Sequence, residues 1–189
     1  MPKIESIMET MREQKIPEET MSKFVLPKTK KAKPIEILEF INQMDEFLSE
    51  EQRLSVMEEQ GCWKSDIIVA KFREFGNKHA NKTIKEKIEL LDELGTKFKV
   101  PCHLNPDGTV AIYWQNGTKG NYSCPCSTAN KLKSSKIPLT YCGCCGGHVR
   151  YNYQYALGAK LRLKEIVSSM INSDGENPCK FIFEIVEDK

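Results

Sequence analysis

No long apolar run and no excess of one charge sign mark this sequence of 189 residues. Because a membrane-spanning helix needs about 18 or more consecutive apolar residues, we expect no such helix. The 28 basic and 26 acidic residues give a net charge of +2, whereas nucleic-acid-binding and membrane-surface proteins are typically strongly basic. The first ten residues lack the apolar core of a secretory signal. We therefore expect a cytoplasmic protein with neither a nucleic acid nor a membrane as partner.

Internal repeats and low-complexity tracts are also missing, and the sequence is 40% hydrophobic and 29% charged. This composition is typical of a globular protein, and the length suits one domain with an appended helical segment. The basic block at 28–33 lies between Pro27 and Pro34, so we interpret it as a solvated linker. The predicted organisation is a helical lead-in with this linker over 1–33, followed by a single domain over 34–189.

Helices are predicted across the first half of the domain. Pro34 opens a segment with apolar residues at helical spacing. Capping boxes, in which Ser or Thr is followed three residues later by Gln or Glu, mark two further helix starts at Ser49 and Thr83. Ser65 can cap another helix. His79 ends the apolar stripe of that helix, and we interpret it as a surface or helix-end residue rather than a metal ligand.

Strands are predicted in the second half. Residues 97–104 and 109–115 are rich in β-forming residues and are split by Asn105-Pro106-Asp107-Gly108, which predicts a hairpin. Residues 160–170 and 179–187 form two further predicted strands. Helices followed by strands favour an α+β fold with a helical layer over a parallel βαβ arrangement.

One more helix is predicted between the two pairs of strands. It runs from Cys144 to Leu157, with Gly158 as its natural stop. Asp174-Gly175 supplies the bend between the last two strands.

Cysteine is concentrated in one region, 124–148. Five of the eight cysteines and one of the three histidines fall there, in motifs that read C-P-C and, fifteen residues later, C-G-C-C-G-G-H. In a reducing compartment, clustered cysteines are more often metal ligands or reactive thiols than disulfides. The candidate metal ligands are Cys124, Cys126, Cys142, Cys144, Cys145 and His148.

Zinc is the predicted cofactor of this region. A structural zinc site takes four thiolate or imidazole ligands, which two short knuckles can supply. Cys144 and Cys145 lie four and three residues before His148, so either pair shares one face of a helix. The spacing differs from the C-x2-C knuckles of zinc ribbons, so an iron–sulfur cluster and a metal-free site stay open.

Nucleophilic catalysis is the competing interpretation. Cys142, Cys144 and Cys145 lie near a predicted helix start, where the helix dipole lowers a thiol pKa. His148 can act as the general base one turn away, and the glycines of the motif expose N–H groups that can hold an oxyanion. A third interpretation treats the cysteines as small apolar residues of the core.

The helix that follows His148 carries polar and aromatic side chains that suit a ligand pocket. Arg150, Asn152 and Tyr155 are the candidate ligand-binding residues there, and Arg150 can meet an anionic group. The alternative is an ordinary half-buried helix with tyrosines at its rim and Arg150 in a surface ion pair.

The segment from Tyr141 to Glu187 resembles the carboxy-terminal part of vinyl-reductase-type ligand-binding domains and of 2-aminothiazoline-4-carboxylate hydrolase-like proteins. The shared plan is a cysteine-led helix, a strand, a Gly/Asp turn at 174–178, and a closing strand that begins Cys179-Lys180-Phe181. The resemblance implies a helical layer that covers an antiparallel sheet, with a small-molecule pocket between them and Cys179 near it. The two cysteine motifs indicate a distinct cysteine-rich prokaryotic family that shares this fold.

Three functions follow from these patterns. The first is a cytoplasmic protein that binds zinc or another thiophilic ion through the cysteine cluster, with a small-molecule ligand beside it. The second is a thiol-dependent hydrolase of a small heterocycle or amide, with one of the clustered cysteines as nucleophile and His148 as base. The third is an interaction module that uses the amino-terminal helices. The oligomeric state is open.

Overall fold

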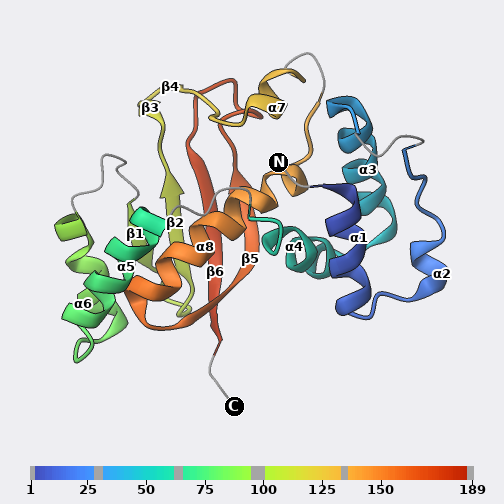
Figure 1. Ribbon diagram of the computed structural model, residues 1–189. Helices are drawn as coiled ribbons and strands as arrows, with labels where there is room; N and C mark the ends of the chain where they lie inside the picture. Colours follow the sequence, from blue (N-terminus) through green and yellow to red (C-terminus); the bar gives the residue numbers. More distant parts are fainter. Residues whose placement is uncertain (1–2, 28–31, 62–65, 95–100, 133–135, 187–189) are drawn as a thin grey trace.

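The computed structural model describes residues 3–27, 32–61, 66–94, 101–132 and 136–186. The fold is α+β, as predicted. Figure 1 shows a four-stranded antiparallel sheet with the long helix α8 (Gly143–Leu157) across one face, and a group of amino-terminal helices to one side. Within these ranges, none of the helices combines the length and apolar character needed to cross a membrane.

The sheet has the strand order β1-β2-β6-β5, and each neighbouring pair is antiparallel. β1 (Cys102–Leu104) and β2 (Val110–Trp114) form the predicted hairpin. β5 (Lys160–Ser168) ends two residues earlier than expected, and β6 (Cys179–Val186) lies between it and β2. The aromatic side chains of β6, Phe181 and Phe183, are fully buried in the hydrophobic cluster that the sheet forms with α8.

The amino-terminal helices are α1 (Ile4–Glu13), α2 (Glu18–Met21), α3 (Pro34–Phe47) and α4 (Glu50–Glu58). The predicted lead-in is thus two helices, and its buried side chains share one hydrophobic cluster with α3 and α4. The segment therefore contributes to the core rather than lying apart from it.

Helix starts agree with their predicted caps. The Oγ of Ser49 accepts a hydrogen bond from the N–H of Gln52 at 3.2 Å, and the Gln52 side chain accepts one from the Ser49 N–H at 3.0 Å. Thr83 and Glu86 form the same reciprocal pair at the start of α6 (Ile84–Glu89). Gly158, at a φ of 65°, ends α8 in the left-handed region.

The middle of the chain adds detail to the predictions. A 3₁₀ turn, η1 (Leu91–Leu94), follows α6. Of the two positions predicted for His79, the helix end is the one found: it follows α5 (Asp66–Lys78) and is buried against Phe75. The proposed cap Ser65 lies outside the described residues, as do Cys62 and residues 97–100.

The cysteine region contains short elements that the sequence does not predict. A small hairpin joins β3 (Gly117–Thr118) to β4 (Asn121–Tyr122). One turn of helix, α7 (Ser127–Asn130), follows the C-P-C motif, and a 3₁₀ turn, η2 (Leu139–Cys142), leads directly into α8. The region is therefore folded along most of its described length.

Two hydrophobic clusters form the core. The first joins α1, α2, α3 and α4 to η2, and it includes Cys144. The second joins the sheet to α5 and α8, and it includes Cys142 and Cys179. Cys124 and Cys145 pack against both clusters. The cysteine region thus lies at the seam where the two parts of the core meet.

Candidate functional site

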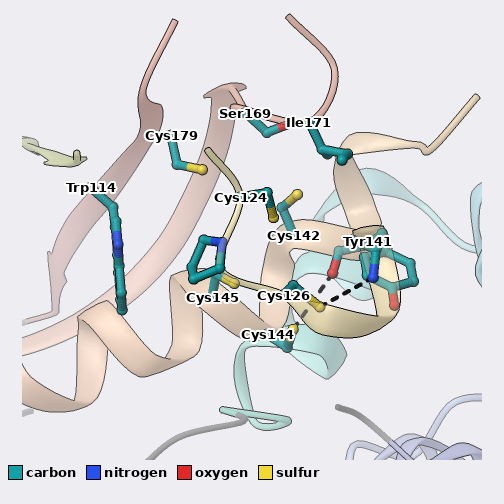
Figure 2. A pocket seen from close by; sticks show the side chains of 12 residues that line it. Trp114, Cys124, Cys126, Tyr141, Cys142, Cys144, Cys145, Ser169, Ile171 and Cys179 are labelled. Carbon is teal, nitrogen blue, oxygen red and sulfur yellow. Dashed lines mark hydrogen bonds between the residues drawn. The ribbon is translucent and has the colours of Figure 1, made fainter. Parts of the chain in front are cut away.

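Six cysteine side chains line one small cavity at this seam. Its volume is about 20 Å³, which exceeds the roughly 10–15 Å³ that one water-sized occupant requires. Figure 2 shows side chains gathered there from the C-P-C loop, the start of α8 and the start of β6. The lining residues are Trp114, Cys124, Pro125, Cys126, Ala129, Tyr141, Cys142, Cys144, Cys145, Ser169, Ile171 and Cys179.

The C-P-C loop reaches the cavity because the β3–β4 hairpin is bound to the turn before β6. The N–H of Tyr122 donates to the carbonyl oxygen of Gly175 at 2.8 Å. Gly175 has a φ of 87°, and a Cβ there would lie 2.5 Å from the Tyr122 carbonyl oxygen, so only glycine fits this approach. The contact holds the chain just before Cys124 next to the chain that leads into Cys179.

The other three cysteines come from the start of α8. Cys142 is the last residue of η2 and the N-cap of α8, while Cys144 and Cys145 belong to the first turn of the helix. Cys142 and Cys144 are buried, and Cys145 is half-buried. One helix start therefore supplies three thiols to the cavity.

The glycines of the C-G-C-C-G-G-H motif allow this helix start to pack closely on both sides. A Cβ at Gly143 or Gly147 would collide with α4, in the second case at the backbone carbonyl oxygen of Glu58. A Cβ at Gly146 would lie 2.8 Å from a methyl group of Leu163 on the sheet. The glycine spacing thus reflects the insertion of α8 between α4 and the sheet.

These glycine amides have partners within the local backbone. The N–H of Gly143 donates to the carbonyl oxygen of Thr140. Gly146 and Gly147 lie inside α8, where N–H groups bond to the carbonyl four residues earlier once the preceding turn is helical. The structure therefore gives no support to the predicted oxyanion-binding role of these amides.

Burial determines the direction in which the pKa values of the most deeply buried thiols shift. Burial raises the pKa of the Cys142 thiol well above its usual range, and the neighbouring Cys179 adds to the effect, whereas a hydrogen bond with Ser169 opposes it. Burial also raises the pKa of Cys179 to about 11. Desolvation of the fully buried thiolate therefore outweighs the predicted lowering of the Cys142 pKa at the helix start.

Several thiols have hydrogen bonds with the backbone, among them Cys179 with Met170. The Cys144 Sγ donates to the carbonyl oxygen of Tyr141 at 3.6 Å, and the Cys126 Sγ accepts from the N–H of Ala129 at 3.5 Å (Figure 2). The hydroxyl of Tyr141 is buried next to Cys126, and the pKa of Tyr141 is raised by burial and by Cys126 and Cys144. Tyr141 thus forms one wall of the cavity beside these two thiols.

The donor atoms suit a thiophilic ion, but their present positions do not form a ligand set. Within the described part of the chain, no three His, Cys, Asp or Glu side chains are already placed to hold a metal ion. The six predicted ligands do not all lie at the cavity. The five cysteines line it, whereas His148 is not among its lining residues. Binding of an ion would require rotation of the cysteine side chains toward one another.

His148 lies one turn further along α8, where it is buried. Its ring packs at 4.9 Å, centroid to centroid, from that of Trp114, and Trp114 lines the cavity whereas His148 is not among the lining residues. Its Nε2 is 3.3 Å from the side-chain nitrogen of Asn152. The oxygen of that amide is buried and has no hydrogen-bond partner among the residues that the structure describes. His148 and Asn152 therefore form a polar pair inside the helix–sheet layer.

The predicted ligand-binding residues are not gathered in one place. Arg150 forms ion pairs with Glu58 at 2.9 Å and with Glu59 at 2.8 Å. Tyr155 accepts a hydrogen bond from Arg73 at 3.1 Å on the α5 side of α8. Of the four candidates, Cys179 alone lines the cysteine cavity.

Sequence reasoning assigned Cys179 to a small-molecule pocket and did not group it with the other thiols. It also missed Tyr141, Trp114 and Ser169 as lining residues. Cys179 follows the Gly/Asp turn, and Ser169 precedes that turn. Gly175 was the one signal in the sequence for this turn. A single sequence does not show that the backbone of Tyr122 packs against it.

Comparisons with known proteins identify no family. No family model matches the chain, and no curated protein matches it. Among solved structures, an H-NOX protein from S. oneidensis in its Fe(II)NO ligation state covers 96% of this chain and 99% of its own, at 11% identity and a TM-score of 0.33. A likeness this low carries no argument about function.

Proposed function

We propose that the chain is a cytoplasmic protein that binds zinc or another thiophilic ion through its cysteine cavity, with a small organic ligand beside the ion. The observation that carries the proposal is the convergence of six thiols from three separate segments on one cavity. Soft ions prefer sulfur ligands, and thiolates bind zinc, copper(I) and similar ions more readily than hard cations. The ligand beside the ion rests on the sequence prediction alone.

Bound metal would connect the two hydrophobic clusters. Cys144 belongs to the first cluster and Cys142 to the second, and Cys124 contacts both. Because an ion that binds only the folded state stabilises that state, its ligands would hold α8, β6 and the C-P-C loop together. A structural role for the ion therefore fits the position of the cavity.

The test is elemental analysis of the full chain, purified without added metal and kept reduced. We expect near-stoichiometric zinc or another thiophilic ion that is lost from a double C124S/C126S variant. C102S is the matched control, because Cys102 is buried on β1 and is not among the cavity lining. Protein that purifies without metal, and afterwards takes up no zinc, cadmium or arsenite, would contradict the proposal.

A second candidate is the thiol-dependent hydrolase. The observation that favours it is the contact between Asn152 and His148, since an amide can orient a histidine base for a cysteine nucleophile. Cys145 is the half-buried thiol one turn before His148, and it is the nucleophile of this alternative. Mass mapping after brief treatment with iodoacetamide at neutral pH tests it: selective labelling of Cys145 in metal-free protein supports this alternative, and uniformly slow labelling contradicts it.

A further inference from the structure

The six cysteines of the cavity are all reduced thiols, and they differ in accessibility. Three are half-buried, so that part of each side chain is open to solvent: Cys124, Cys126 and Cys145. The other three are buried: Cys142, Cys144 and Cys179. Accessible and buried thiols therefore share one cavity.

The buried thiols have sulfur neighbours on other segments of the chain. Cys142 interacts electrostatically with Cys179, Cys144 and Cys124, in order of decreasing strength. Cys179 also interacts with Cys124. Figure 2 shows that these side chains come from the C-P-C loop, the start of α8 and the start of β6. The cavity thus brings together thiols that are far apart in the sequence.

This arrangement has the parts that reversible thiol oxidation requires. An accessible thiol meets the oxidant, and a second thiol nearby captures the sulfenic acid before it is oxidised further. The cavity volume of about 20 Å³ exceeds what a water-sized occupant needs, and hydrogen peroxide is a neutral molecule only slightly larger than water. Cys102 offers a comparison within the chain, because it is buried on β1 and is not among the lining residues.

We propose that the six-cysteine cavity is a redox centre at which a hydroperoxide closes a reversible disulfide between two of the lining cysteines. The sulfur of an accessible thiol attacks hydrogen peroxide, the oxygen–oxygen bond breaks, and one water leaves. A second cavity thiol then attacks the resulting sulfenic acid. The sulfur–oxygen bond breaks, a sulfur–sulfur bond forms, and the hydroxide leaves with the thiol proton as a second water. Each sulfur loses one electron, and the peroxide gains two.

The test treats the reduced full chain, at low concentration and after a chelator has removed any bound metal, with one equivalent of hydrogen peroxide. The remaining thiols are then blocked, and peptide mapping without reduction locates the disulfide. We expect a monomer that has lost two hydrogens, with a disulfide between two cavity cysteines and with Cys102 still reduced. Dithiothreitol should restore every thiol.

A variant without the half-buried thiols separates this chemistry from unspecific oxidation. C124S/C126S/C145S is expected to lose peroxide-dependent oxidation at least about tenfold in rate, because buried cysteines react slowly with solutes. Serine is close to cysteine in size, and the three positions are only half-buried, so the variant should fold. C102S is the control and is expected to be oxidised at the rate of the unmodified chain.

The inference requires no bound ion and is therefore independent of the proposed function. A chain that binds no thiophilic ion, yet forms the cavity disulfide, supports this inference and contradicts only the proposed function. Oxygen added to cysteines without a disulfide overturns the inference. So does a disulfide that takes a cysteine from outside the cavity or from a second chain, or equal oxidation rates for the triple variant and the unmodified chain.

Discussion

At the residue scale, the protein contains buried ionisable groups whose environments oppose their charged forms. Glu58 is an example outside the cysteine cavity: its carboxylate is buried, accepts a hydrogen bond from the N–H of Leu163 at 2.7 Å and pairs with Arg150. Burial raises its pKa from 4.5 to about 7, although Arg150 and the Leu163 N–H act in the opposite direction. The folded state therefore binds this proton more tightly than the unfolded chain does.

This shift predicts a pH dependence of stability. Because the pKa is raised in the folded state, the stabilisation is complete below pH 4.5 and is lost as the pH rises to about 7. Relative to E58Q, the unfolding free energy of the unmodified chain should fall by about 3 kcal/mol across this window. Urea titrations at several pH values measure the difference. E59Q removes the exposed partner of Arg150, and its unfolding free energy should depend on pH as that of the unmodified chain does. The same pH dependence in E58Q would contradict the assignment of the effect to Glu58.

At the element scale, the close crossing of α4 and α8 positions the thiols at the start of α8. A G147A substitution is expected to destabilise the protein by about 3 kcal/mol or more, because its Cβ would overlap the carbonyl oxygen of Glu58. G146A is the matched control: its Cβ meets only side-chain atoms of Leu163 and Phe181, which can shift. Alanine improves helix propensity by about 1 kcal/mol in both variants. If G146A and G147A unfold at the same denaturant concentration, α4 and α8 pack less closely than described.

Local sequence patterns predicted most of the helices and strands. The features that they missed depend on contacts between residues far apart in the sequence. Ser49, Thr83 and Gly158 mark real helix ends because caps depend on neighbouring residues. The short β3–β4 hairpin depends instead on the distant Gly175, which a local pattern does not contain. His148 was grouped with the cysteines from helical spacing, yet Trp114, from β2, packs against its ring. Helical spacing predicted the face of α8 on which His148 lies, but it did not predict that Trp114 packs there.

At the scale of the whole molecule, the cysteine cavity lies where two hydrophobic clusters meet. The first cluster is built from the amino-terminal helices and the second from the sheet with α5 and α8. Thiols from both clusters line the cavity, so an ion there would bond across the seam. A site of this kind links binding to the stability of the complete fold rather than to one element.

X-ray absorption of the full chain, loaded with one equivalent of zinc or arsenite, tests most directly whether the cysteines form one all-sulfur site. The structure predicts a first coordination shell of sulfur alone, because six cysteines and no histidine are among the described residues that line the cavity. The C102S control should give the same spectrum, and C179S should lose sulfur neighbours. A nitrogen neighbour from histidine, or a shell of oxygen ligands with no sulfur, would contradict the account.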